Sequence, residues 1–397
     1  MSLGTPFHAR TEPLNRKKQW REWSGFFASS VYADQHDIEY NAIREAAALI
    51  DVSPLFKYEV AGPDATRLVD RVITRDANRL ALGQVYYTPW CDEAGKVVDD
   101  GTIHRLTSDR YRWTAADPQL RWLRQNAAGL EVAIEETTDR LAALALQGPR
   151  SREVLEAATG ESFADLRYFR GRAAVLRGIH VDVSRTGYTG DLGYELWVEA
   201  ADAVGVWDAV MEAGRPFGIR PAGMLALDVV RLEAGLILLE VDYTSARHAM
   251  NADQAYSPFE IGLGRLVDLA KADFVGKRAL EAETRAGGPS RRLVGLELEW
   301  AGIEALHAAQ DLPPAVPAAV SRTPVPVFDV TGRQVGRATS TGWSPILKAA
   351  IALASVPPSH ETIGSQLTVE WSVEGRRGRV NARVVRLPFL DLRRKRA

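Results

Sequence analysis

The feature that most constrains the fold of this chain is a change of pattern near residue 290. Before it, runs with helical spacing of apolar residues alternate with strand-like runs, and after it short strand-like runs are separated by turn residues. The stretch AETRAGGPSRR at residues 282–292 separates the two patterns and combines two glycines, a proline and charges. With 397 residues, too many for one ordinary core, we expect two parts: a mixed region over residues 1–285 and a small β-barrel or sandwich over residues 292–397.

The mixed region indicates an α+β fold. Helices and strands alternate in it without a glycine-rich phosphate loop or a dinucleotide fingerprint, which argues against a nucleotide-binding fold. A later stretch, residues 308–326, carries five prolines and is expected to be extended or loop. The helical patterns lie at residues 38–49, 63–72, 203–213, 220–235 and 276–286, and strand-like runs lie at residues 56–60, 179–184, 194–199 and 293–298.

Composition narrows the classes of partner. Lys and Arg number 49 against 51 Asp and Glu, so the chain has no basic footprint for nucleic acid, and we expect the basic residues 393–396 to be a solvated tail. The single cysteine, Cys91, and isolated histidines give no metal-ligand spacing. No apolar stretch approaches the roughly 18–20 residues that span a bilayer, and the first residues lack the apolar core of a signal peptide. We expect a cytoplasmic, metal-free protein without a membrane partner.

The stretch RTGYTGDLGYELWVEA, residues 185–200, is the first candidate site. Its glycines predict a tight turn, which leads into a strand on which Glu195, Trp197 and Glu199 share one face. A carboxylate in this setting suits a flat ring edge that donates two parallel N–H bonds. An ordinary salt bridge between Glu195 and a neighbouring arginine fits the pattern equally well.

Two further stretches carry candidate polar residues. DEAGK predicts a turn between two strands, which places Asp99 and Asp100 on the returning strand with their side chains on opposite faces, unless the pair lies in a solvated loop. The stretch RPAGMLALDVVRLEAG, residues 220–235, predicts an amphipathic helix in which Asp228 and Arg231 could simply form an intrahelical ion pair.

Taken together, the motifs resemble the aminomethyltransferase family, which includes the glycine cleavage T-protein and related tetrahydrofolate-dependent methyltransferases and demethylases. The resemblance runs from about residue 40 to the C-terminus and rests on motifs in the family's order. These are DEAGKVVDD, LQGPR, SRTGYTGDLGYE, RPAG…RLEAG, SPFEIGL…FVGKRAL and STGWSP…IALASV.

The resemblance implies three domains in a ring around a central channel for tetrahydrofolate, with residues 1–285 forming two intertwined α+β subdomains and residues 292–397 the barrel. It implies that Glu195 binds the pterin edge and that Asp100 is the catalytic carboxylate beside the reactive nitrogen of the folate. By the same resemblance, the other cofactor-binding residues are Tyr188, Tyr168, Tyr87 and Arg231.

The departures from the T-protein pattern gather on the donor side. DVSPLFK replaces the usual DVSHMGE, Leu227 replaces an arginine, and His104 replaces a tyrosine. The segment at residues 236–256 is longer than its T-protein counterpart by roughly ten residues, as loops that set specificity often are. We expect this segment, with Arg247 and His248, to cover the channel mouth and to contact the substrate together with His104.

The family resemblance predicts an enzyme that moves a methyl or aminomethyl-derived carbon from a donor to tetrahydrofolate. The donor is either a small-molecule methyl donor, which makes the enzyme a demethylase, or a lipoyl carrier protein, as in glycine cleavage. The alternative is a folate-binding protein without catalytic activity, of the iron–sulfur maintenance type.

Overall fold

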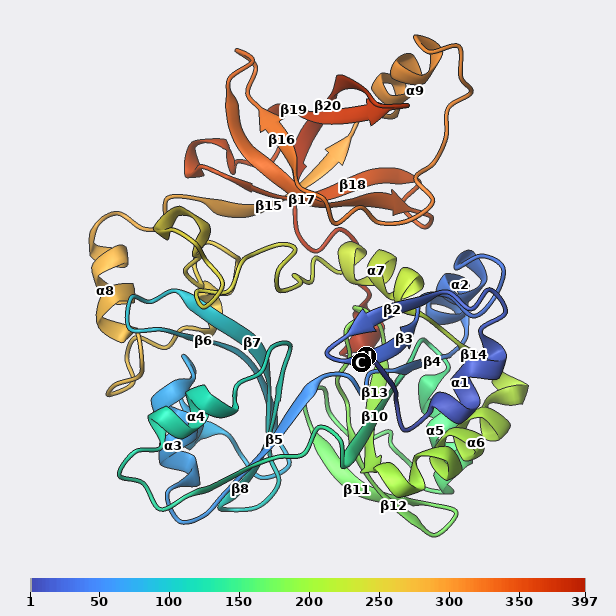
Figure 1. The fold of residues 1–397 in the computed structure, drawn as a ribbon, viewed down its shortest axis with the longest axis vertical. Coiled ribbons are helices and arrows are strands. Elements are labelled where there is room, and N and C mark those ends of the chain that lie inside the picture. The colour runs from blue at the N-terminus through green and yellow to red at the C-terminus, as the bar shows by residue number, and fades with distance from the viewer. Residues whose placement is uncertain (1, 397) are drawn as a thin grey trace.

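The computed structural model describes residues 2–396 and contains three lobes that meet around a centre (Figure 1). The first lobe holds a five-stranded sheet of order β6-β7-β8-β5-β9, and the second holds a six-stranded sheet of order β11-β12-β13-β10-β4-β14. The third lobe is a closed barrel of order β15-β18-β17-β16-β19-β20. The predicted α+β class with a C-terminal β-barrel is confirmed.

The sheet of the first lobe is antiparallel throughout: β6 with β7, β7 with β8, β8 with β5, and β5 with β9 all pair in opposite directions. The predicted hairpin is present: the Lys96 backbone N–H donates to Asp92 Oδ1 at 2.9 Å in the turn between two strands. The elements of this lobe are β5 (Phe56–Ala61), α3 (Ala65–Val72), β6 (Val85–Cys91), β7 (Val97–Arg105), β8 (Arg110–Ala115), α4 (Leu120–Asn126) and β9 (Ala133–Glu136).

The second lobe corrects one expected boundary. The pattern at residues 38–49 predicts one helix, but the helix ends at Glu45 and residues 48–51 form a strand between β10 and the edge strand β14. The apolar run Ala-Leu-Ile is fully buried there, and such a run suits a buried strand as well as a buried helix face. The elements are α2 (Asp37–Glu45), β4 (Ala48–Asp51), β10 (Leu141–Gln147), α5 (Ser151–Thr159), β11 (Gly171–Leu176), β12 (Ile179–Ser184), β13 (Gly193–Glu199), α6 (Ala203–Gly214), β14 (Arg220–Pro221) and α7 (Met224–Glu233).

The barrel is reached through α8 (Lys277–Arg285) and the expected glycine-rich joint. Its strands alternate buried apolar residues with exposed polar ones, as the walls of a small filled barrel require. Of the proline-rich residues 308–326, Ala308 ends a helix and Val325–Pro326 begin a strand, while the residues between them carry no helix or strand. The barrel elements are β15 (Arg292–Leu298), α9 (Trp300–Ala308), β16 (Val325–Phe328), β17 (Gln334–Ser344), β18 (Ala349–Val356), β19 (Gln366–Val373) and β20 (Arg376–Val385).

The N-terminal residues form a small sheet of order β1-β3-β2 that packs on the second lobe. Arg10 pairs with Asp208 of α6 at 2.7 Å, and Arg21 pairs with Asp228 of α7 at 3.0 Å. Its elements are β1 (Leu3–Gly4), α1 (His8–Leu14), β2 (Trp20–Trp23) and β3 (Phe26–Ser29). Short 3-10 turns elsewhere lie at Ala77–Arg79, Ala200–Asp202, Arg215–Phe217, Ala252–Gln254, Gly264–Leu266, Pro358–His360 and Arg393–Lys395.

One apolar cluster joins the three lobes. It contains Val97 of the first lobe, Ala145 and Leu227 of the second and Ile351 of the barrel, each at most 6% exposed. Tyr87 and Tyr188 pack against the same cluster from the first and second lobes. Burial of this shared cluster holds the lobes together, so side chains near it keep fixed positions relative to one another.

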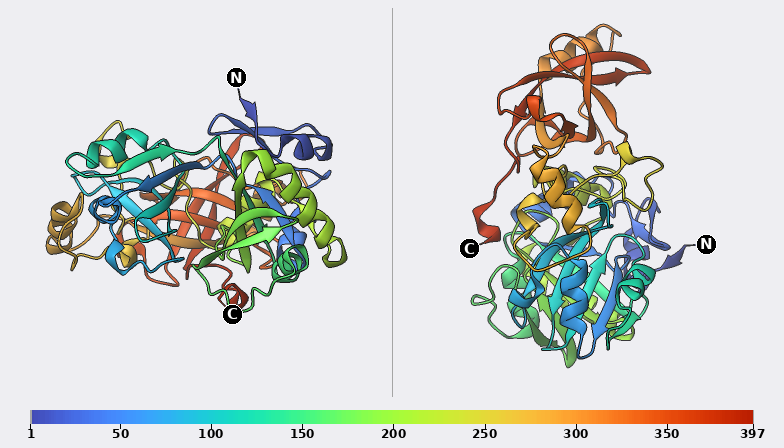
Figure 2. Two further views of the ribbon diagram at one scale, coloured as in Figure 1. Left: turned by 90° about the horizontal axis from the view of Figure 1, so that it is seen from below. Right: turned by 90° about the vertical axis from the view of Figure 1, so that its left-hand side faces the viewer.

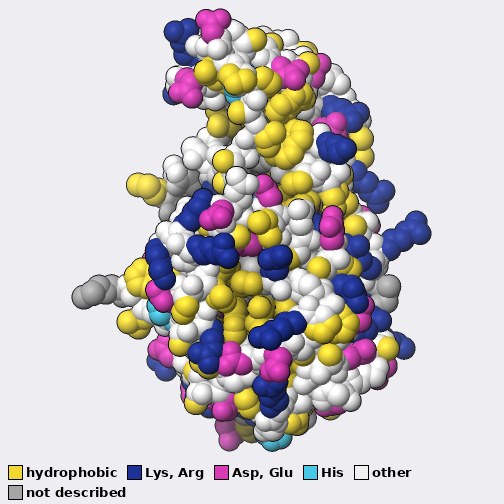
Figure 3. Space-filling view, turned by 90° about the vertical axis from the view of Figure 1, so that its right-hand side faces the viewer, with side chains coloured by type: hydrophobic (Ala, Val, Ile, Leu, Met, Phe, Trp, Pro, Cys, Tyr) yellow, Lys and Arg dark blue, Asp and Glu magenta, His cyan; other side chains and the backbone are white. Residues whose placement is uncertain are grey.

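The two chain ends lie on opposite faces of the molecule (Figure 2). The N-terminal sheet lies on one face of the second lobe and the C-terminal tail runs back from the barrel along the other. On the side of the molecule that the second lobe forms, basic and acidic side chains are interspersed, and the barrel stands above a narrower waist (Figure 3).

Candidate functional site

The glycine-rich turn at residues 185–193 is shaped by two different demands. Gly190 has a φ of +68°, which L side chains rarely adopt. At Gly187 and Gly193 the demand is space, because a Cβ there would lie 2.1 Å and 2.3 Å from the side chain of Gln147. The Gln147 amide donates to the Thr186 carbonyl at 3.2 Å and accepts from the Thr189 hydroxyl at 2.7 Å. The Gln147 side chain, from the LQGPR motif, therefore packs against both glycines and sets the shape of the turn.

Glu195 follows the turn on β13, between β10 and β12 in the sheet. The Thr186 hydroxyl donates to Glu195 Oε2 at 2.6 Å. Burial raises the pKa of Glu195, while the Thr186 hydroxyl and the charge of Arg112 oppose that rise. Arg112 forms its ion pair with Asp182. Glu195 is thus a partly buried carboxylate with one oxygen held by a hydroxyl, on the strand face that the alternation pattern predicts.

Asp99 and Asp100 both lie on β7, not in a solvated loop. The Asp99 side chain is fully buried and accepts from the backbone N–H groups of Ala116 and Asp117 and from the side chain of Gln119, at 2.9–3.2 Å. The neighbouring Asp100 instead accepts from two tyrosines. The different partners show that the two carboxylates point in different directions, as expected for adjacent residues on a strand.

The Asp100 carboxylate is bound at both oxygens. The Tyr87 hydroxyl donates to Oδ2 at 2.7 Å, and the Tyr243 hydroxyl donates to Oδ1 at 2.5 Å. Burial raises the pKa of Asp100, and the two hydroxyls oppose that rise. Sequence reasoning found Tyr87 by resemblance but missed Tyr243, because nothing in the pattern of the long segment distinguishes this tyrosine from a core residue.

Tyr188 and Tyr168 lie near these two carboxylates. The Tyr188 hydroxyl donates to the backbone carbonyl of Ile237. Burial raises the pKa of Tyr188, and the charge of Asp100 adds to the rise. The pKa of Tyr168 is also raised by burial, and the charge of Glu195 acts on this phenol in the same direction.

Arg231 is fully buried and connects three parts of the chain. Its guanidinium donates to Asp242 at 2.8 Å and to the Ser340 hydroxyl of the barrel at 2.9 Å. Asp228, one turn earlier on α7, lies 3.6 Å away and also binds Arg322 of the barrel. The intrahelical pair considered from sequence is therefore the minor part of the contacts of Arg231.

The expected donor-side residues do not form one group. The Arg247 guanidinium donates to the Pro118 carbonyl at 2.7 Å, and the half-exposed His248 ring lies 3.1 Å from Asp117 and 3.0 Å from Glu240. His104 lies elsewhere, in a groove of about 440 Å³ between the two sheets. Burial lowers the pKa of His104 to about 4.

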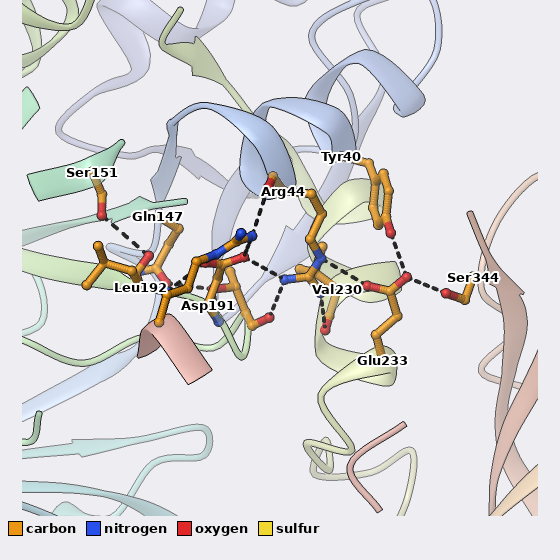
Figure 4. A network of polar contacts seen from close by, with 11 residues as sticks. Tyr40, Arg44, Gln147, Ser151, Asp191, Leu192, Val230, Glu233 and Ser344 are labelled. Carbon is orange, nitrogen blue, oxygen red and sulfur yellow. Dashed lines mark hydrogen bonds and ion pairs between the residues drawn. The ribbon is translucent and has the colours of Figure 1, made fainter. Parts of the chain in front are cut away.

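A buried polar network holds the glycine-rich turn at Asp191 in place (Figure 4). Arg44 of α2 binds Glu233 of α7 at 2.6 Å and Asp191 of the turn at 3.3 Å. Glu233 also accepts from the hydroxyls of Tyr40 and Ser344, each at 2.6 Å. The network links the second lobe to the barrel and fixes the base of the turn that precedes Glu195.

Residues 2–396 contain no group of three or more His, Cys, Asp or Glu side chains placed to hold a metal ion. Within the same residues, no helix has the length and apolar character needed to cross a bilayer.

The family comparisons agree with this architecture. Residues 11–271 match the GCVT N-terminal domain, and residues 291–391 match the glycine cleavage T-protein C-terminal barrel domain. The chain therefore belongs to the glycine cleavage T-protein family, and the resemblance read from its motifs is confirmed.

Individual relatives fall into two kinds. A trimethylamine-oxide aldolase of Ruegeria pomeroyi is 36% identical over 98% of this chain and 47% of that protein. An aminomethyltransferase of Moorella thermoacetica is 38% identical over 88% of each chain. The solved structure of the glycine cleavage system aminomethyltransferase T from Bartonella henselae matches with a TM-score of 0.82 and 25% identity, over 98% of this chain and 99% of that one. This chain spans about half the length of the aldolase and most of the length of the aminomethyltransferases.

Proposed function

We propose that this protein is a tetrahydrofolate-dependent one-carbon transferase. The observation that carries the proposal is the pair of partly buried carboxylates, Asp100 on the first lobe and Glu195 on the second, each held by hydroxyl donors in a chain of the T-protein family. The relatives named aminomethyltransferase and trimethylamine-oxide aldolase favour one-carbon chemistry with an amine-derived donor.

The residues of the site fit a reduced pterin. Glu195 would accept two parallel N–H bonds from the flat edge of the ring, and its contact with Thr186 fixes the carboxylate for this purpose. Tyr87, Tyr168 and Tyr188 would supply aromatic walls, and Arg231 would add positive charge near the same space, although its guanidinium already binds Asp242.

Asp100 would act on the reacting end of the cofactor. Tetrahydrofolate, when bound, supplies the nitrogen that accepts the transferred carbon. The Asp100 carboxylate would hold or take the proton at that nitrogen and stabilise positive charge as it develops on the carbon. Positioning by Glu195 and charge stabilisation by Asp100 are then separate tasks, which separate substitutions test.

Two donor classes fit the site: a small-molecule methyl donor and a lipoyl carrier protein. The changed donor-side residues, among them Leu227 and the segment at residues 236–256, favour a donor that differs from that of the plain T-protein. We propose that this segment, with Arg247 and His248, helps to select the donor, whereas His104, which lies apart from them in the groove between the two sheets, would act on the substrate only indirectly. We also propose that residues 1–285 form the folate-binding unit and residues 292–397 the barrel unit, in a protein that acts in the cytoplasm.

A panel of donors tests the proposal. Purified protein is incubated with tetrahydrofolate and, in turn, N-methyl, S-methyl and O-methyl small molecules or an aminomethyl-loaded lipoyl carrier, and folate products are measured by mass spectrometry. We expect one donor class to yield a one-carbon folate at a rate that depends on both reactants. Tight folate binding without turnover with any donor would instead support the non-catalytic alternative.

A further inference from the structure

The contact between Tyr243 and Asp100 joins a loop to the proposed catalytic strand. Tyr243 belongs to the segment at residues 236–256, and its hydroxyl binds the carboxylate oxygen that Tyr87 does not bind. The side chain of Tyr243 is only 1% exposed. One tyrosine from the hairpin and one from the long segment therefore hold Asp100 from two directions.

The long segment is docked on the strand that carries Asp100. The Ala246 backbone N–H donates to the Val97 carbonyl at 2.8 Å, and the Val97 N–H donates to the Tyr256 carbonyl at 2.7 Å. The Ser245 hydroxyl donates to the Val98 carbonyl at 2.6 Å. These bonds lie two or three residues before Asp100 on β7, so the segment and the carboxylate keep a fixed relation.

The residue before Tyr243 anchors the other side of the segment. Asp242 is fully buried, binds Arg231 at 2.8 Å and accepts from the Leu238 backbone N–H at 2.9 Å. Its second oxygen accepts from the hydroxyls of Thr339 and Ser340 of the barrel, at 2.7 Å and 2.6 Å. Every oxygen of Asp242 is thus occupied, which leaves the backbone at Tyr243 little freedom.

We infer that Tyr243 is a positioning residue for Asp100: its hydroxyl fixes the plane of the carboxylate and favours the ionised form over the protonated one, so that Asp100 presents an oriented carboxylate to the reacting nitrogen. The inference rests on the proposed function in that Asp100 is the carboxylate that meets the reacting nitrogen. An ionised carboxylate that accepts two O–H bonds is stabilised relative to its protonated form.

The surroundings of Asp100 make this role necessary. Burial favours the neutral acid at Asp100, and the Asp100 charge in turn raises the pKa of the buried Asp99 on the same strand. The Tyr87 hydroxyl on the hairpin binds the same carboxylate, the charge of Asp100 raises the pKa of Tyr188 on the turn, and Arg231 and Asp242 are paired with each other. The hydroxyls of Tyr87 and Tyr243 are the groups that directly favour the charged form of Asp100.

The test compares Tyr243→Phe with Tyr256→Phe. Tyr256 ends the same segment, is also 1% exposed, and directs its hydroxyl to Arg337, so its substitution removes a buried hydroxyl without touching Asp100. The first measurement is a pH titration of the Asp100 carboxyl by NMR in protein with carbon-13-labelled aspartate, with Asp100→Asn used to assign the signal. We expect the pKa of Asp100 to rise in Tyr243→Phe and to stay at the wild-type value in Tyr256→Phe.

The second measurement is the pH profile of turnover. Because loss of the hydroxyl favours the protonated acid, the acid limb of kcat should move to higher pH in Tyr243→Phe. At a pH on that limb, turnover should fall by up to about 10-fold for each pH unit by which the limb moves, and it should recover as the pH rises, with KM for folate unchanged. Should Tyr243→Phe fail to fold, 3-fluorotyrosine at position 243 is a second variant. Its hydroxyl is a stronger hydrogen-bond donor than that of tyrosine, so the pKa of Asp100 should fall instead of rise.

An unchanged Asp100 pKa in folded Tyr243→Phe, or in the fluorotyrosine protein, overturns the inference. Absence of turnover with every donor overturns the proposed function instead, while the NMR titration still decides the role of Tyr243.

Discussion

Arg394, near the end of the chain, donates through Nε and Nη2 to both oxygens of Asp191, at 2.6 Å and 2.8 Å, across 203 positions of sequence. Its Nη2 also donates to the Arg44 carbonyl. The expectation of a solvated basic tail is therefore wrong for this residue. Asp191 is fully buried, and a buried carboxylate needs cationic partners, which α2 and the tail provide from opposite ends of the sequence.

Substitution of Arg394 should weaken the fold. Arg394→Ala leaves Asp191 with the longer contact to Arg44, and we expect the free energy of unfolding to fall by about 1–3 kcal/mol, since Arg394 is itself partly exposed. Urea unfolding checks this, with Arg393→Ala, an exposed neighbour, as control. Equal stability of the two variants would show that the tail contributes nothing to the network.

Glu195→Gln should weaken folate binding by roughly 10- to 100-fold, the loss expected when a charge-assisted hydrogen-bond pair becomes neutral. Glu199→Gln is the matched control, because Glu199 lies on the same strand face but is exposed. Titration calorimetry measures both. Because burial raises the pKa of Glu195, wild-type affinity should decline on acidification at a higher pH than an ordinary glutamate would give. Unchanged affinity in folded Glu195→Gln would remove this residue from the site.

Asp99→Asn should act on stability. Asp99 Oδ2 accepts from the backbone N–H groups of Ala116 and Asp117, and Oδ1 accepts from the Asp100 N–H at 2.7 Å. Whichever way an asparagine amide lies, its N–H₂ group meets N–H donors on one side, and those donors lose their acceptor. We expect a loss of about 1–3 kcal/mol in the free energy of unfolding. The exposed Asp109→Asn is the control. A variant as stable as wild type would mean that the Asp99 site rearranges around the amide.

His104 should make the fold sensitive to mild acid. Its pKa in the folded protein is lowered to about 4 by burial, against about 6.5 when unfolded, so the unfolded chain takes up the proton first. Stability should therefore fall as the pH drops through about 6.5 towards 4. In His104→Asn this slope should shrink between pH 6.5 and 5, whereas the exposed His180→Asn should keep it. Identical slopes in all three proteins would contradict a neutral, buried His104.

The elements of the fold that the sequence predicts are those that depend on residues close together in the chain. The hairpin around Asp92 and Lys96 follows from turn residues between strands, and the common face of Glu195 and Glu199 follows from the two-residue period of a strand. The resemblance then supplied the order of the lobes and the candidate residues at the site.

The remainder depends on contacts that no local pattern records. Gly187 and Gly193 predict a flexible turn, but the reason for both is the bulk of Gln147, forty or more positions earlier. The partners of Asp191 and Asp100 likewise come from distant segments, Arg394 from the tail and Tyr243 from the long segment. Hydrogen bonds of this kind follow from the packing of whole lobes, which a single sequence does not reveal.

The central claim is that Asp100 serves the chemical step and Glu195 serves binding. The most direct measurement is single-turnover transfer of carbon-13 from a labelled methyl or aminomethyl donor to tetrahydrofolate, followed by NMR in wild type and in Asp100→Asn. We expect label on the folate in wild type, and a rate at least roughly 100-fold lower in Asp100→Asn at unchanged folate affinity. Transfer at the wild-type rate in folded Asp100→Asn, or loss of the label from the donor without its appearance on folate, would contradict it.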